Sequence, residues 1–257
     1  MYNKGGMKLL FLGTGTSTGI PQIGCDCEVC QSINPKDKRL RTSLLITIEN
    51  KNILIDCGPD FRQQMLKYNI KQLDAVLLTH HHYDHVSGLD ELRSFTKDKA
   101  MTICAEQYVE DTIKRTFPYC FGVNKYPGVA TFDIKSIENR EFDVSNIKVL
   151  PIRVMHYNLP VFGYRIGNVA YITDMLTISD EELEKLKSLD VLIINALRYK
   201  KHISHQTLDD ALGIISRVSP HKAYIIHISH QMGLHDEVSK QLPENVSLAY
   251  DGLQIEL

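Results

Sequence analysis

One short segment of the sequence concentrates side chains that bind metal ions. The run HHHYDH at positions 80–85 places four potential ligands within six residues, namely His80, His82, Asp84 and His85. Imidazole and carboxylate groups together suit divalent zinc, manganese or iron. His80 and His82 lie two residues apart and can face one ion, while Asp84 and His85 can turn to a second. The spacing therefore predicts a two-metal centre.

The segments on either side of this run can hold it in place. Residues 75–78 are apolar, as in a buried strand, and lead directly into the histidines. After the run, Val86, Leu89, Leu92 and Phe95 recur every three residues, which predicts one amphipathic helix. A strand before the ligands and a helix after them would fix the loop that carries them.

A centre with two ions needs further ligands, and the ends of other expected strands supply candidates. Strands are expected over 147–152, 169–173 and 223–226, and they are followed by His156, Asp174 and His227. Each of these residues alone is a weak signal, because a polar side chain at a strand end often has a structural role. Together with the loop, they make up the set that a dinuclear centre requires.

A second cluster of candidate ligands is formed by cysteines. Cys25, Cys27 and Cys30 have the spacing C-x-C-x-x-C, which in a reducing compartment indicates metal binding before disulfides. Three thiolates leave a structural zinc one ligand short. His230, three residues after His227, is the candidate for the fourth ligand; the alternative is that it only forms a nearby hydrogen bond.

The composition is that of an ordinary globular protein. The chain has 257 residues, of which 43% are apolar and 23% charged, and a formal net charge of -2. Charges of both signs are interspersed, which does not favour nucleic acid as a partner. No apolar run approaches the roughly 20 residues that cross a membrane, and the apolar stretch near the start is too short for a secretory signal. We therefore expect a cytoplasmic protein with no membrane partner.

Short strand-like and helix-like segments alternate along the chain. Further strands are expected over 8–12, 43–48, 52–55, 102–104, 164–166, 191–195 and 246–249, and helices over 61–68, 179–186 and 208–215. This pattern predicts an α/β (α+β) fold of two sheets with helices outside. We expect one domain over residues 7–257 after an N-terminal extension of residues 1–6. Residues 105–145 are the least regular, and the aromatic insert at 117–126 is interpreted as a packed surface loop, with a lid or dimer contact as the alternative.

The chain resembles the metallo-β-lactamase superfamily, whose H-x-H-x-D-H loop is matched at positions 80–85, and the resemblance extends over residues 9–255. It implies an αββα sandwich of two mixed sheets flanked by helices. It also implies one metal site from His80, His82 and His156, and a second from Asp84, His85 and His227, with Asp174 bridging the two ions.

The cysteine cluster narrows this resemblance. Together with G-x-G at 13–15, H-I-S-H-Q at 227–231 and Y-D-G at 250–252, it is similar to the phosphoribosyl 1,2-cyclic phosphate phosphodiesterases of the carbon–phosphorus lyase pathway. That subfamily implies two catalytic metals, commonly manganese, a separate structural zinc and a homodimer. The implied ligands of the zinc are Cys25, Cys27, Cys30 and His230.

One histidine outside the metal sets matches a catalytic position of the subfamily. His205 lies just before a predicted helix, and its implied role is to bind the phosphate and to protonate the leaving oxygen; the alternative is a surface residue at a helix start. We count Asp84 with His205 as catalytic. His202, His221 and His235 match no role and are expected at the surface.

These features predict a hydrolase of small cyclic phosphodiesters, such as phosphoribosyl cyclic phosphates or cyclic nucleotides. A hydroxide bridging two manganese or zinc ions would attack the phosphorus. One alternative is a nuclease of the ribonuclease Z or 5′-exonuclease type, although the sequence has no long basic RNA-binding insertion. The other is a metal-binding protein without turnover, against which the intact set of seven ligands argues.

Overall fold

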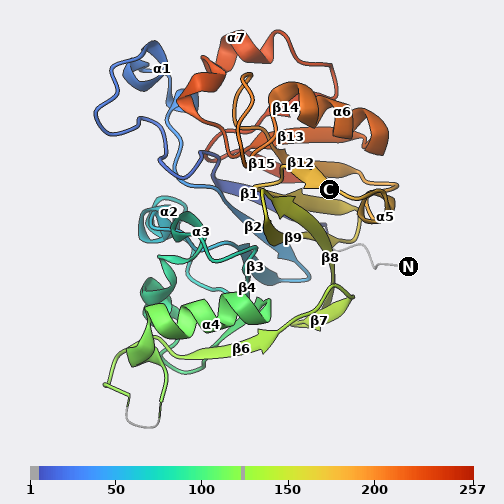
Figure 1. The fold of residues 1–257 in the computed structure, drawn as a ribbon. Helices are drawn as coiled ribbons and strands as arrows, with labels where there is room; N and C mark the ends of the chain where they lie inside the picture. The colour runs from blue at the N-terminus through green and yellow to red at the C-terminus, as the bar shows by residue number, and fades with distance from the viewer. Residues whose placement is uncertain (1–5, 123–124) are drawn as a thin grey trace. The chain divides into compact units, whose positions relative to one another are not determined.

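Two β-sheets, each with its own helices, account for most of the regular structure (Figure 1). The structure is a computed structural model that describes residues 6–122 and 125–257. Unit 1 comprises the chain up to Gly13, Thr42–Glu138 and Gly252–Leu257, and unit 2 comprises Thr14–Arg41 and Asn139–Asp251. Residues 1–5 of the predicted extension lie outside the described part, and the single domain over 7–257 stays a prediction.

The sheet of unit 1 has seven strands in the order β15-β1-β2-β3-β4-β5-β6. Antiparallel pairing joins β15, β1, β2 and β3, and parallel pairing joins β3 to β6. The sheet is therefore mixed. The strands are β1 (Lys8–Gly13), β2 (Ser43–Ile48), β3 (Lys51–Ile55), β4 (Ala75–Leu77), β5 (Met101–Ala105), β6 (Phe132–Ser136) and β15 (Gln254–Glu256).

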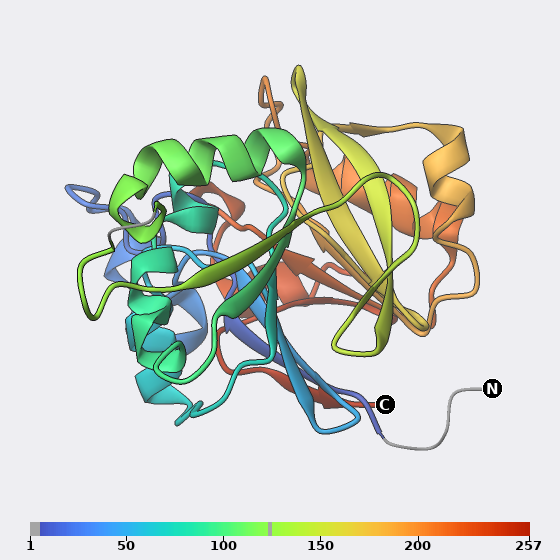
Figure 2. The ribbon, with the colours of Figure 1, turned by 90° about the horizontal axis from the view of Figure 1, so that it is seen from below.

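Helices cover one face of this sheet through an apolar cluster. Phe61 of α2 (Phe61–Lys67), Leu89 of the 3-10 helix η2 (Leu89–Phe95) and Ile113 of α4 (Gln107–Thr116) are buried in the same cluster as Val76 and Ile103 of the strands. In both views α4 lies beside β6 (Figures 1 and 2). α4 falls in the segment that the sequence left as least regular, so the expectation there missed a helix.

The prediction of one helix across positions 86–95 is wrong. The chain forms a short helix α3 (Tyr83–Val86) and then η2. Gly88, between them, donates its N–H to Cys57 O, and a Cβ on Gly88 would lie 2.1 Å from Gly58 O. This close approach of two backbone segments interrupts the helix that the apolar spacing suggests.

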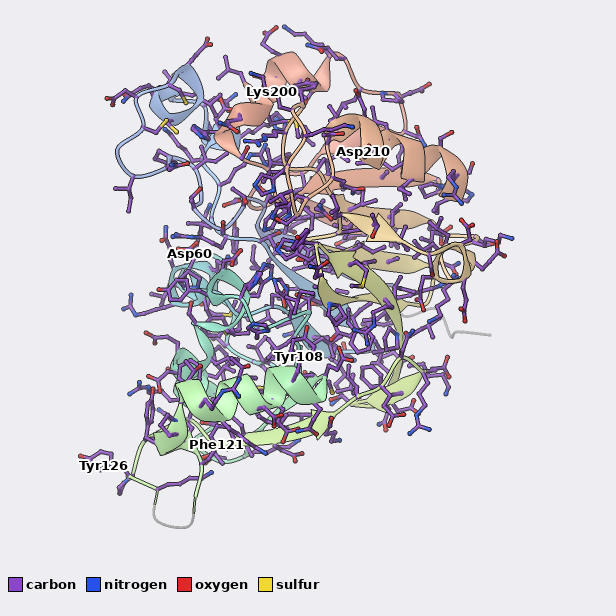
Figure 3. The ribbon with its side chains drawn as sticks, in the orientation of Figure 1. Asp60, Tyr108, Phe121, Tyr126, Lys200 and Asp210 are labelled. Atoms are coloured by element: carbon purple, nitrogen blue, oxygen red, sulfur yellow. The ribbon has the colours of Figure 1, made fainter. Side chains whose placement is uncertain are left out.

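The aromatic insert is partly packed in unit 1. Phe117 is buried, and the Phe121 ring lies 5.9 Å from the Phe132 ring, whereas Tyr119 and Tyr126 are exposed (Figure 3). Residues 123–124 of the insert lie outside the described part. Its packed residues agree with the interpretation as a surface loop, and a role as lid or dimer contact stays a prediction.

The sheet of unit 2 has the order β11-β8-β9-β10-β12-β13-β14, with β7 paired to β8. It is also mixed, because β7 to β11 pair antiparallel and β10, β12, β13 and β14 pair parallel. The strands are β7 (Phe142–Val144), β8 (Ile147–His156), β9 (Leu159–Ile166), β10 (Val169–Ile172), β11 (Thr177–Ile178), β12 (Val191–Asn195), β13 (Lys222–Ile226) and β14 (Val246–Leu248).

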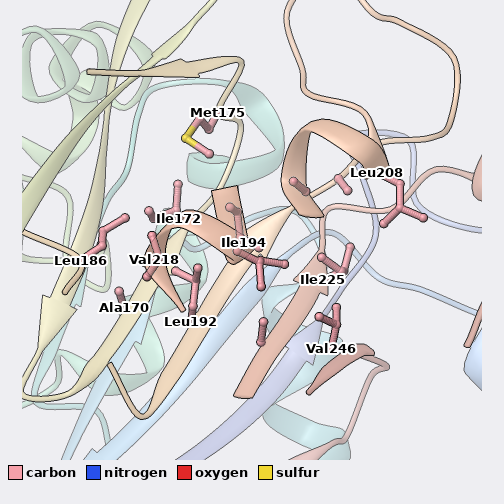
Figure 4. Packing of buried hydrophobic residues seen from close by; sticks show 14 of the residues in the cluster. Ala170, Ile172, Met175, Leu186, Leu192, Ile194, Leu208, Val218, Ile225 and Val246 are labelled. Atoms are coloured by element: carbon pink, nitrogen blue, oxygen red, sulfur yellow. The ribbon is translucent and has the colours of Figure 1, made fainter. Parts of the chain in front are cut away.

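Helix α6 (Leu208–Val218) of unit 2 packs against the sheet of that unit. Leu208 and Val218 of this helix share a buried cluster with Ile172, Leu192 and Ile225 of the strands (Figure 4). α6 begins at a capping box in which the Thr207 hydroxyl accepts from Asp210 N and the Asp210 carboxylate accepts from Thr207 N. The remaining helices are α1 (Glu28–Gln31), η1 (Pro35–Asp37), α5 (Asp180–Glu184), η4 (His230–Met232) and α7 (His235–Ser239).

Two mixed sheets flanked by helices confirm the predicted α/β class. Among the described residues, no helix combines the length and the apolar character needed to cross a bilayer.

Candidate metal sites

The predicted histidine loop of unit 1 follows β4 and runs into α3, which contains Asp84 and His85. His80 and His85 are fully buried and Asp84 is nearly so. The His80 ring lies 4.5 Å from the His82 ring and 4.3 Å from the His85 ring, and His85 Nε2 lies 3.1 Å from Asp84 Oδ2. The structure thus brings the four predicted loop ligands together, and their donor atoms, imidazole nitrogen and carboxylate oxygen, fit a divalent metal.

Asp56 is a buried carboxylate that contacts this loop, and the sequence analysis missed it. Asp56 Oδ2 lies 2.7 Å from His85 Nδ1, and its carboxylate also accepts from the backbone N–H and the hydroxyl of Thr79. The same hydroxyl lies 3.0 Å from His80 Nδ1. When Nδ1 carries the proton of these contacts, Nε2 of each imidazole keeps its lone pair for a metal. Burial raises the pKa of Asp56, and the charge of His85 opposes that shift.

Three candidate ligands of unit 2 lie at the ends of its strands. His156 ends β8, Asp174 follows β10 and His227 follows β13. Asp174 and His227 have φ of 56° and 55°, in the left-handed region that non-glycine residues rarely occupy. Backbone strain of this kind gathers at functional sites, where the surrounding structure holds it.

The side chains at these strand ends converge. Asp174 Oδ1 lies 3.3 Å from His227 Nε2 and 3.8 Å from His205 Nδ1. The His205 ring lies 4.5 Å from the His156 ring, and His156, Asp174 and His205 each offer a ligand atom within 4.8 Å of the others. His156 Nδ1 donates to Ser204 O over 2.8 Å, which leaves Nε2 as the donor for a metal.

His205 is buried in this cluster. Among the described residues, its Nδ1 has no hydrogen-bond partner. Burial lowers the pKa of His205 to about 3, against the opposing charge of Asp174, so the imidazole is neutral at pH 7 in the metal-free chain. A neutral imidazole beside Asp174 can accept a bond at one nitrogen and donate at the other. The role of His205 as proton donor stays a prediction.

The cysteine cluster also comes together with His230 in unit 2. Nδ1 of His230 lies 3.2 Å from Cys25 Sγ, 3.2 Å from Cys27 Sγ and 3.6 Å from Cys30 Sγ. Zinc bonds of about 2.3 Å to sulfur and 2.0 Å to nitrogen, at tetrahedral angles, put sulfur and nitrogen about 3.5 Å apart. The four residues therefore fit a structural zinc in both donor type and spacing.

The thiols of this cluster differ in acidity. The backbone N–H of Cys30 lowers the pKa of Cys27 to about 6, whereas burial raises the pKa of Cys30 to about 11. Cys27 is therefore a thiolate at neutral pH, and a divalent cation would be drawn to it first.

Comparison with known proteins assigns the chain to a family. A family model described as the beta-lactamase superfamily domain matches residues 51–228. A solved structure of a new diphosphatase from the PhnP family superposes with a TM-score of 0.92 and 38% identity, covering 98% of this chain and 97% of that one. The chain belongs to the metallo-β-lactamase superfamily and, within it, to the PhnP family. This confirms the predicted resemblance and makes the chain a metal-dependent hydrolase.

Two other relatives share the fold of this superfamily member. An octanoyltransferase of Porphyromonas gingivalis is 47% identical over 251 residues, which cover 96% of this chain and 51% of that protein. The chain thus spans about half the length of this relative. The short form of human tRNase Z is 20% identical, with a TM-score of 0.67 over 96% of this chain, and shows a shared fold.

Membership of the PhnP family does not test which residues of this chain bind metal, so the predicted metal ligands stay predictions. The loop residues belong to unit 1, and His156, Asp174, His205 and His227 belong to unit 2. The grouping of both sets in one dinuclear centre, the bridging role of Asp174 and the zinc bound by the cysteines therefore stay predictions.

Replacing Asp56 with asparagine tests the support of the histidine loop. The amide keeps the size of the side chain but removes the charge that orients His85, so we expect the affinity for divalent metal to fall about 10–100-fold. Titration of metal-free protein with manganese measures the change. Asp98→Asn, at an exposed position of the same unit, is the control. Equal affinity in the Asp56 variant and the wild type would contradict this role.

Proposed function

We propose that this chain hydrolyses small phosphodiesters with two divalent metals, manganese or zinc. The proposed ligands are His80, His82, Asp84, His85, His156, Asp174 and His227. The observation that carries the proposal is the position of His205, a buried imidazole beside Asp174 and His156 in the lining of a cavity. It offers a proton-transfer group next to the proposed ligands.

The reaction divides between the metals and the side chains of the chain. Bound metals would supply positive charge that offsets the charge of the phosphate and acidifies water. In the hydrolysis, an oxygen of water forms a bond to phosphorus, the bond from phosphorus to the leaving oxygen breaks, and the leaving oxygen takes up a proton. His205 binds the phosphate and, after it has taken up a proton from solvent, passes that proton to the leaving oxygen, while the attacking water releases one proton to solvent.

The choice of leaving group tests the role of His205. A p-nitrophenolate departs without a proton, whereas an alkoxide needs one, so we expect His205→Ala to lower kcat about 10²-fold for a cyclic alkyl phosphate. For bis-p-nitrophenyl phosphate the loss should be several times smaller. Rates are measured with added manganese. His221→Ala, at an exposed position, is the control. Equal losses on the two substrates would contradict proton donation, and no turnover by the wild type with any divalent metal would refute the proposed function.

A nuclease of the ribonuclease Z or 5′-exonuclease type is the second candidate, and the fold shared with human tRNase Z is the observation in its favour. Turnover of 2′,3′-cyclic nucleotides is compared with turnover of a labelled single strand and of a precursor tRNA. We further propose a cytoplasmic homodimer, for which light scattering of the purified chain gives the mass.

A further inference from the structure

A cavity of about 640 Å³ in unit 2 includes His205 and several residues of α6 in its lining. The lining comprises residues 175–178, Lys201, His202, residues 205–207, and Asp209, Asp210, Gly213, Ile214 and Arg217. In Figure 3, Lys200 lies on the loop before α6 and Asp210 on the first turn of the helix. The volume lies within the range of about 300–1,000 Å³ that small-molecule sites occupy.

The lining of the cavity contains two cationic and two anionic side chains. Lys201 and Arg217 oppose Asp209 and Asp210, and Arg217 is itself paired with Asp180 outside the cavity. A second phosphate would meet carboxylates as well as cations here. An uncharged group with hydroxyls meets donors and acceptors instead, without the cost of burying a net charge.

A basic run at positions 198–202 (RYKKH) precedes His205, and its arginine forms hydrogen bonds within the same loop. Arg198 donates from Nε to Lys200 O and from Nη2 to Lys201 O, so its guanidinium holds the loop in shape. It also bonds Gln231. Arg198 is therefore held by its own loop and by Gln231, and it is not among the lining residues of the cavity.

The cavity also has an apolar wall. Met175 is fully buried, and Leu176, Ile178 and Ile214 are partly buried in the lining. At Gly213 of α6, which also lines the cavity, an added Cβ would meet no atom within 4 Å. A larger side chain at position 213 would therefore fill part of the cavity.

We infer that this cavity binds the leaving alcohol of the diester, and that it fits an uncharged, hydroxylated group of nucleoside size with one apolar face. The inference rests on the proposed function, since His205 in the cavity lining would deliver the proton to the oxygen of that alcohol. The apolar wall receives the flat face of the group, and the carboxylates of α6 accept from its hydroxyls. The fit of the alcohol to the cavity then determines which phosphodiesters are hydrolysed with a high kcat/KM.

Filling the cavity tests this assignment. The two substrates are adenosine 2′,3′-cyclic phosphate, in which the leaving oxygen is a hydroxyl oxygen of the nucleoside, and the cyclic phosphate of propane-1,2-diol, which has the same five-membered reacting ring on a small diol. For manganese-loaded Gly213→Leu, we expect the ratio of kcat/KM for the adenosine ester to that for the diol ester to fall about 10-fold or more. Leucine favours a helix over glycine, so the fold should be retained. Ser216→Leu introduces the same side chain on α6 at a residue outside the cavity lining and should keep the wild-type ratio.

A binding measurement separates failure of this inference from failure of the proposed function. Calorimetric titration with adenosine needs no turnover; it should detect binding to the wild type and to Ser216→Leu but not to Gly213→Leu. An unchanged substrate ratio in Gly213→Leu, or no binding of adenosine to the wild type, would overturn the assignment. If neither ester is hydrolysed, the proposed function fails, and the adenosine titration still decides the cavity.

Discussion

Replacing Asp174 with alanine is expected to lower kcat/KM for bis-p-nitrophenyl phosphate about 10⁴-fold, which corresponds to about 5 kcal/mol of transition-state free energy. The carboxylate is buried, and its Oδ1 lies 3.3 Å from His227 Nε2 and 3.8 Å from His205 Nδ1. It is the proposed bridge between two metals. Its loss should therefore weaken both metal positions and remove the charge beside His205 in one step.

The conformation at position 174 calls for a second variant. With φ of 56°, alanine there costs about 1–2 kcal/mol of folding free energy. Asparagine tolerates the left-handed region and keeps the size of the side chain while it removes the charge. Asp174→Asn should therefore melt close to the wild type and still lose activity about 10³-fold or more.

Metal analysis completes the test of Asp174. Both variants should lose at least one catalytic metal per chain on dialysis, whereas the zinc of the cysteine cluster should remain. Asp190→Asn, at a half-exposed position in the same unit, is the control for removal of a carboxylate. Full activity of Asp174→Asn with its full metal content would show that this residue is not a catalytic ligand.

The ligands of the histidine loop could be predicted from the sequence because they lie within six residues of one another. The residue that orients one of them, Asp56, could not. Asp56 was missed because its partner His85 lies 29 residues further along the chain. The parallel pairing of β3 with β4 explains the contact: Ile55 lies opposite Leu77, so the residues just after the two strands emerge side by side. A carboxylate directly after an apolar strand, as in Ile55-Asp56, was the available signal.

His235 shows a second limit of the sequence. It was expected at the surface, and this expectation is wrong, since His235 is buried in unit 2. Its Nδ1 lies 3.1 Å from Arg39 Nη2, and its backbone N–H donates to Asp37 Oδ1. Both partners lie almost 200 positions earlier in the chain, in the segment that follows the cysteine cluster. A local pattern of apolar and polar residues does not predict a buried polar contact between residues so far apart in the sequence.

Loss of the structural zinc should have the largest effect on stability. Replacing the buried Cys30 with serine removes one of the four proposed ligands, and we expect the melting temperature to fall by more than about 10 °C. Structural zinc contributes about 10–16 kcal/mol of binding free energy in small peptides, and in a domain of this size each 1 kcal/mol shifts the melting temperature by about 2–4 °C. Even a fraction of the zinc energy would therefore exceed that shift.

The reason for so large an effect is the small apolar core around the cysteines. Cys30 packs in a cluster that has Ile20 and Val29 as its other buried members, with Cys25 and Leu234 partly buried against it. Three buried side chains stabilise little by themselves. Without the metal, the segment from Gly24 to Lys38 would be held mainly by contacts such as those of Asp37 and Arg39.

A matched control distinguishes loss of zinc from the cost of a buried serine. Cys120→Ser also puts a hydroxyl in place of a buried thiol, but Cys120 belongs to unit 1 and is not one of the proposed zinc ligands. It should keep one zinc per chain and melt within a few degrees of the wild type, whereas Cys30→Ser and Cys27→Ser should lose that zinc. A double variant, His82→Ala with Asp84→Ala, should lose catalytic metal and retain the zinc. The opposite result, zinc retained in Cys30→Ser and lost in the double variant, would contradict the assignment. It would mean that the histidine loop, and not the cysteine cluster, binds the structural zinc.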